Sequence, residues 1–419
     1  MTTPRVPDAP PAVRRQLPRW SQLRPLLGFQ APALGTRARL ARAATIDDLR
    51  DQARRHTPRS VFDYTDGAAD DESSLTRSRE LYARAEFAGQ VLNDIAAVDL
   101  STTILGEQVS MPLVLGPTGF TRMMNHEGET AVAHEARRAQ VAYSLSTMGT
   151  TPLERVAEVS GPNPHWFQLY LWQDRPASIE LIERARESGY SALVVTVDTA
   201  VAGNRLRDVR NGLTIPPKLT PKTFLDMATH PGWWGNLLTT EPLEFASLSN
   251  WEGTVAEMIN KMFDPSVTWD DVAWLRGMWP GKVVLKGIQS AEDAVRAFDL
   301  GVDAVLISQH GGRQIGRGRP PLRVLPEVRE AVGGEREVFV DGGVMSGADV
   351  VAALAHGADS VWVGRAYLYG LMAGGHLGVR RALEIFRSEI TRTMQLLGVS
   401  RIADLRPEYV RLPVDPTVA

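Results

Sequence analysis

Residues 283–310 read VVLKGIQSAEDAVRAFDLGVDAVLISQH. The apolar runs VVLKG and AVLISQH at its two ends are typical of strands buried on both faces, and the segment between them has the pattern of an amphipathic helix. A strand, a helix and a second strand in this order indicate a parallel βαβ unit. The first strand ends on Lys286 and the second on Ser308 and His310, so polar side chains follow each apolar run.

The same alternation extends in both directions along the chain. Six more short apolar runs are LVLGPTG (113–119), VAYSLST (141–147), WFQLY (166–170), LVVTVD (193–198), VFVDGG (338–343) and VWVGR (361–365). Helical patterns such as RPASIELIERARESG and SGADVVAALAHG separate most of them. Eight strands that alternate with helices predict a closed (β/α)₈ barrel, an α/β fold of the TIM type.

The rest of the chain is expected to extend this barrel. An N-terminal helical segment begins at Thr45, where Asp48 completes a capping-box-like start. The long stretch after the fourth strand is too long for a simple connection and predicts an insertion or lid. The predicted divisions are a flexible Pro- and Arg-rich arm at 1–43, the barrel at 44–412, the insertion at about 212–270 and a tail at 413–419.

Composition excludes several classes of protein. The formal charge of −3 gives no reason to expect nucleic-acid binding, and the absence of cysteine excludes disulfides, thiolate metal sites and cysteine nucleophiles. His126 and His134 do not have the spacing of a metal motif, so no metal is expected. The chain has neither a long apolar stretch nor a signal-peptide pattern, which favours a cytoplasmic protein.

Polar residues at the strand ends predict a ligand site, because the carboxyl ends of the strands form the active face of such barrels. They are Pro117, Thr118, Gly119, Ser146, Gln168, Tyr170, Thr196, Asp198, Lys286, Ser308, His310, Asp341, Gly342, Gly343, Gly364 and Arg365. The glycines after the seventh and eighth strands, with Arg365, stand at the usual phosphate position of this fold. The alternative is that these glycines only form tight turns.

Two pairs of side chains indicate chemistry at this face. A carboxylate at Asp198 can orient the imidazole of His310 and raise its basicity, which describes a general base. Arg205 and Arg313 are suited to hold a substrate carboxylate bidentately. A structural histidine and solvated surface arginines are the alternatives. No GxGxxG motif opens a βαβ unit, so a Rossmann dinucleotide site is not expected.

The motifs resemble those of the FMN-dependent 2-hydroxy acid dehydrogenases and oxidases, a family that includes glycolate oxidase, mandelate dehydrogenase and quinone-linked L-lactate dehydrogenase. The resemblance spans roughly residues 45–410 and is nearest to the bacterial quinone-linked L-lactate dehydrogenase branch. The motifs that carry it are FDYTDGAADDE (62–72), FQLYLW (167–172), VTVDTAVAGNRLRDVRN (195–211), LKGI (285–288), SQHGGRQ (308–314), FVDGGVMSG (339–347) and VGRAYLYGL (363–371).

The resemblance implies FMN as cofactor and a role for each matching position. His310 would be the base and Asp198 its partner. The substrate carboxylate would be held by Tyr64, Arg205 and Arg313, and its hydroxyl by Tyr170. Lys286 would stabilise negative charge at the N1–C2=O edge of the reduced flavin. The expected flavin contacts are Pro117, Thr118, Gly119, Ser146, Gln168 and Thr196 at the ring, Ser308 at its edge, and Asp341, Gly342, Gly343, Gly364 and Arg365 at the ribityl chain and phosphate.

A few positions depart from the family pattern. The family usually has SNHGGRQLD where this chain has SQHGGRQIG, so Gln309 and Gly316 predict an altered loop after the sixth strand. Met345 stands where many members place an arginine near the phosphate. Met148 and Ala202 leave room for a 2-substituent larger than that of glycolate.

The implied reaction is oxidation of an (S)-2-hydroxy acid, L-lactate or a larger analogue, with quinone or another acceptor favoured over oxygen. Whether His310 removes the hydroxyl proton or the α-proton stays open. The alternatives are an oxygen-using oxidase of a specialised biosynthetic pathway and a non-catalytic flavin-binding barrel. A homotetramer is expected. For the arm and the insertion, which contains Trp233 and Trp234, two readings stay open: peripheral contact with the inner face of the cell membrane, or a mobile active-site lid with a disordered tail.

Overall fold

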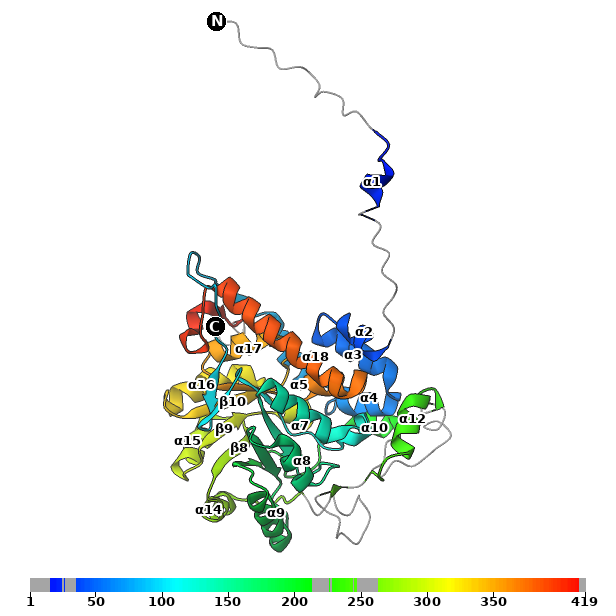
Figure 1. Cartoon of the computed structure of the whole chain (residues 1–419). Coiled ribbons are helices and arrows are strands. Elements are labelled where there is room, and N and C mark those ends of the chain that lie inside the picture. The colour runs from blue at the N-terminus through cyan, green and yellow to red at the C-terminus, as the bar shows by residue number, and fades with distance from the viewer. Residues whose placement is uncertain are drawn as a thin grey trace, which may run out of the picture.

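The strands that the apolar runs predict close into one barrel in this computed structural model, which describes residues 16–24, 26, 35–212, 226, 228–243, 245–246 and 263–413. All eight strands are parallel to their neighbours and follow one another around the barrel in chain order (Figure 1). They are β4 (Leu113–Leu115), β5 (Ala142–Ser146), β6 (His165–Leu169), β7 (Ala192–Thr196), β8 (Lys282–Ile288), β9 (Ala304–Ile307), β10 (Glu337–Asp341) and β11 (Ser360–Val363). The predicted (β/α)₈ barrel is confirmed.

Amphipathic helices surround the strands, because both faces of a parallel sheet must be buried. Side-chain caps mark where two of these helices begin: Ser290 accepts from the backbone of Asp293, and Ser346 from that of Asp349. The barrel helices are α7 (Gly128–Ala139), α8 (Leu153–Ser160), α9 (Arg175–Glu187), α14 (Trp269–Met278), α15 (Ala291–Asp299), α16 (Pro321–Val332), α17 (Gly347–Ala355) and α18 (Arg365–Leu397).

Helices from the N-terminal part of the chain add to this barrel. The helix predicted from Thr45 is α3 (Ile46–His56), and it is followed by α4 (Arg59–Asp66) and α5 (Ser73–Ala83). A further helix, α2 (Thr36–Ala41), lies within the predicted arm but packs on α18 through Leu40, which is 3% exposed. The boundary expected at residue 44 is therefore too late. The described part of the arm also holds α1 (Trp20–Leu23), and residues 1–15, 25 and 27–34 lie outside the description.

The amino end of the barrel is filled by apolar side chains. A hairpin of β2 (Thr102–Ile104) and β3 (Glu107–Val109) packs Ile104 and Val109 against the interior residues Trp166 and Trp362. The two tryptophan rings lie 5.4 Å apart. This packing leaves the carboxyl ends of the strands as the face that can receive a ligand. The short strands β1 (Glu86–Phe87) and β12 (Val410–Arg411) pair elsewhere on the surface.

The predicted insertion is described in part. It contains α12 (Pro231–Leu238), and α10 (Leu206–Asn211) ends just before its expected start. Trp233 in α12 donates to the carbonyl of Met123 over 3.0 Å, so this indole faces the barrel. Residues 213–225, 227, 244 and 247–262, and the tail 414–419, lie outside the described residues, so the lid prediction is untested there. Within the described ranges no helix has the length and apolar character needed to cross a membrane.

Candidate functional site

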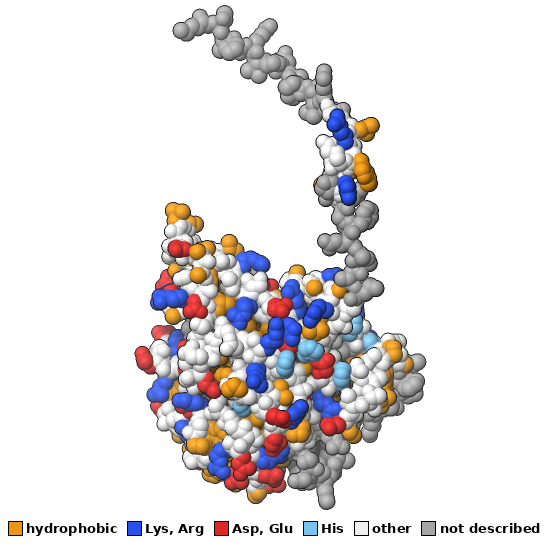
Figure 2. Space-filling view, viewed as in Figure 1, with side chains coloured by type: hydrophobic (Ala, Val, Ile, Leu, Met, Phe, Trp, Pro, Cys, Tyr) orange, Lys and Arg blue, Asp and Glu red, His pale blue; other side chains and the backbone are white. Residues whose placement is uncertain are grey.

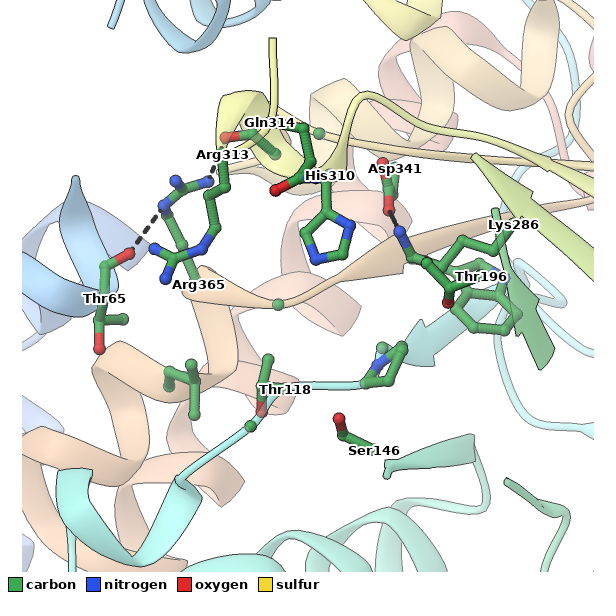
Figure 3. Close-up of a pocket in the computed structure, with 18 of the residues that line it drawn as sticks. Thr65, Thr118, Ser146, Thr196, Lys286, His310, Arg313, Gln314, Asp341 and Arg365 are labelled. Carbon is green, nitrogen blue, oxygen red and sulfur yellow. Dashed lines mark hydrogen bonds and ion pairs between the residues drawn. The ribbon is translucent and has the colours of Figure 1, made fainter. Parts of the chain in front are cut away.

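A cavity lies at the carboxyl ends of the strands, and each of the eight strands contributes to its lining through the end of the strand or the loop that follows it. Of the predicted site residues, only Asp198 and Ser308 are not in the lining, and both contact residues that are. Figure 3 shows His310 pointing into this cavity, with Arg313 and Arg365 on one side and Lys286 and Asp341 on the other. The carboxyl-end site that the polar strand ends predict is therefore assembled in one place.

His310 and Asp198 meet as expected. Nδ1 of His310 lies 3.0 Å from Oδ1 of Asp198, across the mouth of the barrel from β9 to β7. Burial lowers the pKa of His310, and the Asp198 carboxylate opposes that shift. Burial alone would raise the pKa of Asp198, but His310 and Lys286 outweigh it, so this carboxyl's pKa is lowered. A neutral ring that donates Nδ1–H to the carboxylate has Nε2 available to accept a proton.

Two arginines stack on one aromatic ring at the cavity. The guanidinium carbons of Arg205 and Arg313 lie 5.2 and 4.8 Å from the ring centre of Tyr64. Burial, with the positive charges of Arg205 and Arg365, lowers the pKa of Arg313 to about 10. Arg205 has one acidic contact, with Asp208 at 3.4 Å. Adjacent, half-buried and only partly compensated cations form a site suited to an anion.

Lys286 is held in place by Ser308 and Asp341. Its Nζ donates to the hydroxyl of Ser308 over 3.0 Å and lies 3.6 Å from the Asp341 carboxylate. The Ser308 hydroxyl donates in turn to Asp341 and accepts from the backbone N–H of His310. Ser308 is fully buried behind the cavity, which corrects its expected place at the flavin edge. Its hydroxyl is already used to position the lysine and the histidine.

A row of hydrogen-bonded side chains crosses the floor of the cavity. Ser146 donates to Gln168, and the amide of Gln168 donates to Thr196, each over 3.0 Å. Thr118 lies 2.6 Å from the hydroxyl of Tyr367, which anchors it on α18. These bonds fix the direction in which each polar group faces, so the floor is ordered before a ligand arrives.

Arg365 has partners that the sequence could not reveal. Its guanidinium donates to the carbonyls of Thr65, Gly67 and Gly311 at 2.7 to 2.9 Å. Arg365 therefore also joins the end of α4 and the loop after it to the loop after β9. Arg365 still lines the cavity beside Gly343 and keeps N–H groups beyond those three bonds.

The two departures after β9 anchor the loop to α5. The buried side chain of Gln309 donates to the carbonyl of Ser74 over 3.2 Å and to the hydroxyl of Ser78. The carbonyl of Gly316 accepts from Ser74, and a side chain at Gly316 would collide with Asp70. The altered sequence thus builds a loop that is tied to α5.

The lining residues that the sequence did not predict include Arg79, Thr199, Phe263 and Gln314. Gln314 follows Arg313 directly, and its amide donates to the carbonyl of Asp198 over 3.0 Å, so its position was a usable signal. Arg79 lies in α5, far from any strand end, and only the packing of α5 brings it to the cavity.

The cavity has the donors and acceptors that FMN needs. Beside the polar floor and the Lys286 cation, Oδ1 of Asp341 is buried without a hydrogen-bond partner among the described residues, and so is Nε of Arg79. Buried polar atoms are nearly always paired, so such atoms at a cavity mark ligand contacts. An unpaired carboxylate oxygen suits ribityl hydroxyls and an unpaired guanidinium N–H suits a phosphate. The described residues contain no group of His, Asp or Glu placed to hold a metal ion.

Comparison with known proteins agrees with this geometry. The family model of FMN-dependent dehydrogenases matches residues 53–412. A Mycobacterium tuberculosis protein provisionally named L-lactate dehydrogenase is 50% identical over 400 residues, which cover 95% of this chain and 97% of the relative. Human 2-hydroxyacid oxidase 1 is 37% identical over 374 residues, covering 89% of this chain and 97% of that protein. The structure of (S)-mandelate dehydrogenase, described as a monotopic membrane protein, is 34% identical with a TM-score of 0.85, covering 89% of this chain and 100% of that one.

The family match spans most of the chain and includes the strand ends that form the cavity. Relatives of this identity and coverage share more than the barrel. The chain belongs to the FMN-dependent dehydrogenases, and it is an oxidoreductase that uses FMN.

Proposed function

We propose that this enzyme oxidises (S)-2-hydroxy acids to 2-oxo acids. The observation that carries the proposal is one cavity in which a base, His310 with Asp198, lies beside the paired cations Arg205 and Arg313. A 2-hydroxy acid presents a carboxylate one bond from the carbon that is oxidised, so it needs this combination of groups. The names of the relatives, which refer to L-lactate, mandelate and 2-hydroxy acids, support it.

The arginines bind and orient the substrate. Arg205 and Arg313 hold the carboxylate, while the Tyr64 ring beneath them keeps both guanidiniums in place. Tyr170 is proposed to hydrogen-bond the substrate hydroxyl, and its buried position in the cavity lining supports this role. Burial and the nearby Asp198 raise the pKa of this phenol, so it remains a hydrogen-bond donor at neutral pH.

His310 takes the proton that leaves the substrate. Asp198 then stabilises the imidazolium, since its carboxylate is already bonded to Nδ1. FMN, when bound, accepts the two electrons. Lys286, held by Ser308 and Asp341, supplies the positive charge that offsets the negative charge gained in that step.

Substrate size and electron acceptor are finer parts of the proposal. Met148 and Ala202 line the cavity, and they support a 2-substituent at least as large as that of lactate. We favour quinone or another acceptor over oxygen, in keeping with the relatives named dehydrogenases; relatives named oxidases keep an oxygen-using enzyme as the alternative.

We also infer a cytoplasmic enzyme that contacts the inner face of the membrane peripherally. Leu238 in α12 is 72% exposed and Trp20 in α1 is 67% exposed, and apolar side chains of this kind can enter a lipid interface. Figure 2 shows Lys or Arg and hydrophobic side chains together on the segment that contains α1. The expected homotetramer stays a prediction, which the mass of the protein in solution would test.

Anaerobic reduction of the bound flavin tests the reaction. Mixing the enzyme with a panel of L- and D-2-hydroxy acids should bleach the flavin only with L-acids, and reoxidation by quinone should be faster than by oxygen. The His310→Gln variant should keep its flavin while bleaching slows by a factor of about 10² or more. Unchanged bleaching in this variant would rule out His310 as the base, and a flavin that no 2-hydroxy acid bleaches would favour a non-catalytic barrel.

A further inference from the structure

Arg79 is a cation at the cavity, and no anionic partner for it lies in the described part of the chain. It comes from α5 and lines the cavity beside Gly343 and Gly364. Its Nη2 contacts the Tyr369 hydroxyl at 3.4 Å and the Met345 sulfur at 4.0 Å, while its Nε is buried and unpaired. Within the described ranges it forms no ion pair, so the charge of this half-buried side chain is left uncompensated at the cavity.

A second guanidinium makes this end of the cavity more positive. Burial lowers the pKa of Arg365, and the positive charge of Arg79 contributes to that lowering, so the two groups lie close enough to repel each other. The nearby carboxylate of Asp66 is already bonded to Arg50 and Arg207. Arg79 and Arg365 thus face one cavity while the carboxylate of Asp66 is bonded to other arginines. Placing two such cations together costs free energy unless an anion lies between them.

Close packing holds α5 against the glycine turn after β10. Gly343 has a φ of +88°, and a Cβ there would lie 2.9 Å from the Cβ of Ser78, the residue before Arg79. Only glycine allows this approach. Gln309 bonds the same Ser78 hydroxyl from the loop after β9. The position of Arg79 over the turn is therefore fixed from two sides.

We propose that Arg79 binds the phosphate of FMN and makes the site select the 5′-phosphate ester over riboflavin. Its free Nε–H and its remaining N–H groups can donate to phosphate oxygens. The N–H groups at the start of α18, whose N-cap is Gly364, add favourable dipoles at the same place. Arg365 joins the surrounding loops through its three hydrogen bonds to carbonyl groups. Arg79 makes no such bonds to carbonyl groups among the described residues, so its positive charge is available to the phosphate.

Titration of the full chain, freed of its flavin, tests this role. In the Arg79→Gln variant we expect FMN affinity, measured by quenching of flavin fluorescence, to fall about 10- to 100-fold, as is typical when a hydrogen bond to a charged group is lost. Riboflavin affinity should not change. The control is Arg77→Gln on the same helix, because Arg77 is exposed and, among the described residues, bonds the carbonyls of Ser73 and Gly318 rather than groups of the cavity. Both affinities should match those of the wild type.

Two results would overturn the proposal: equal loss of affinity for FMN and riboflavin, which would make Arg79 a structural residue, or no loss for FMN. If the glutamine variant does not fold, Arg79→Lys decides the question. Lysine keeps the charge but loses the planar donor set, so FMN affinity should fall while riboflavin affinity holds. A lysine variant that changes both affinities equally, or neither, would exclude the role.

Discussion

His310 has a φ of 55°, in the left-handed region that residues other than glycine seldom occupy. The Ser308 hydroxyl accepts its backbone N–H, and Asp198 accepts from its ring. Strained conformations of this kind persist where surrounding contacts hold them, and they are concentrated at functional sites. The proposed base is thus oriented through both its main chain and its side chain.

The lowered pKa of His310 gives a prediction for the pH dependence of activity. The reaction needs the neutral ring, so the rate of flavin reduction at low substrate should rise with pH through a pKa below the ordinary value of about 6.5. Asp198 raises that pKa, so in Asp198→Asn the acidic limb should move to lower pH. The rate near neutral pH should also fall by a factor of about 10². Stopped-flow absorbance over a pH series measures both effects.

A suitable control is Asp303→Asn. Asp303 bonds Lys282 and the backbone of Val283 at the opposite end of the barrel, so its pH profile should match the wild type. An unshifted acidic limb in Asp198→Asn would contradict the coupling between Asp198 and His310.

At the scale of elements, α5 connects the loop after β9, which carries His310 and Arg313, to the glycine turn after β10. It bonds the loop after β9 through Ser74 and Ser78, and it packs against the turn after β10 at Gly343. It also carries Arg79 into the cavity. A helix that precedes the barrel in sequence therefore determines the shape of loops that follow its sixth and seventh strands.

Shortening Gln309 should loosen this connection. In Gln309→Asn the amide is one methylene short of Ser74 and Ser78, and leaving such buried groups unpaired costs about 1–3 kcal/mol. The holoenzyme's thermal midpoint should drop by several degrees, and hydrogen exchange should rise in α5. The control is Gln90→Asn in an exposed loop. Equal midpoints for the two variants would mean that the Gln309 bonds do not support α5.

At the scale of the whole molecule, the cofactor cavity draws on every strand of the barrel, whereas the amino end is packed by its own side chains. Ligand binding to only the folded state stabilises it by about 2.7 kcal/mol at a hundredfold excess over Kd. FMN should therefore raise the melting temperature in a concentration-dependent way.

Hydrogen exchange can locate this stabilisation. FMN should protect the carboxyl ends of the strands more than the β2–β3 hairpin, which serves as an internal reference. The prediction that FMN couples the strand ends would be contradicted by either of two results. One is a melting temperature that does not respond to FMN, and the other is protection of the β2–β3 hairpin equal to that of the strand ends.

The barrel and the positions of the proposed site residues could be predicted because both depend on local sequence. Each apolar run marks a strand, and the residue that ends the run lies at the active face, so His310, Asp198 and Lys286 were found from their neighbours alone. The two arginines proposed to bind the substrate were predicted in the same way. Arg205 follows the strand that ends at Asp198, and Arg313 follows His310. For these features, the residues next to each position in the sequence determine where its side chain lies in the barrel.

Only tertiary structure decided which residues support that chemistry. Arg79 and Gln309 are more than two hundred positions apart, yet both depend on the packing of α5 against strand-end loops. Ser308 turned out to lie behind Lys286 because its hydroxyl has three partners from different strands and its own loop. α2, which composition assigned to a flexible arm, is held by burial of Leu40 on α18. Such contacts join distant segments, and no local pattern of hydrophobicity or charge encodes them.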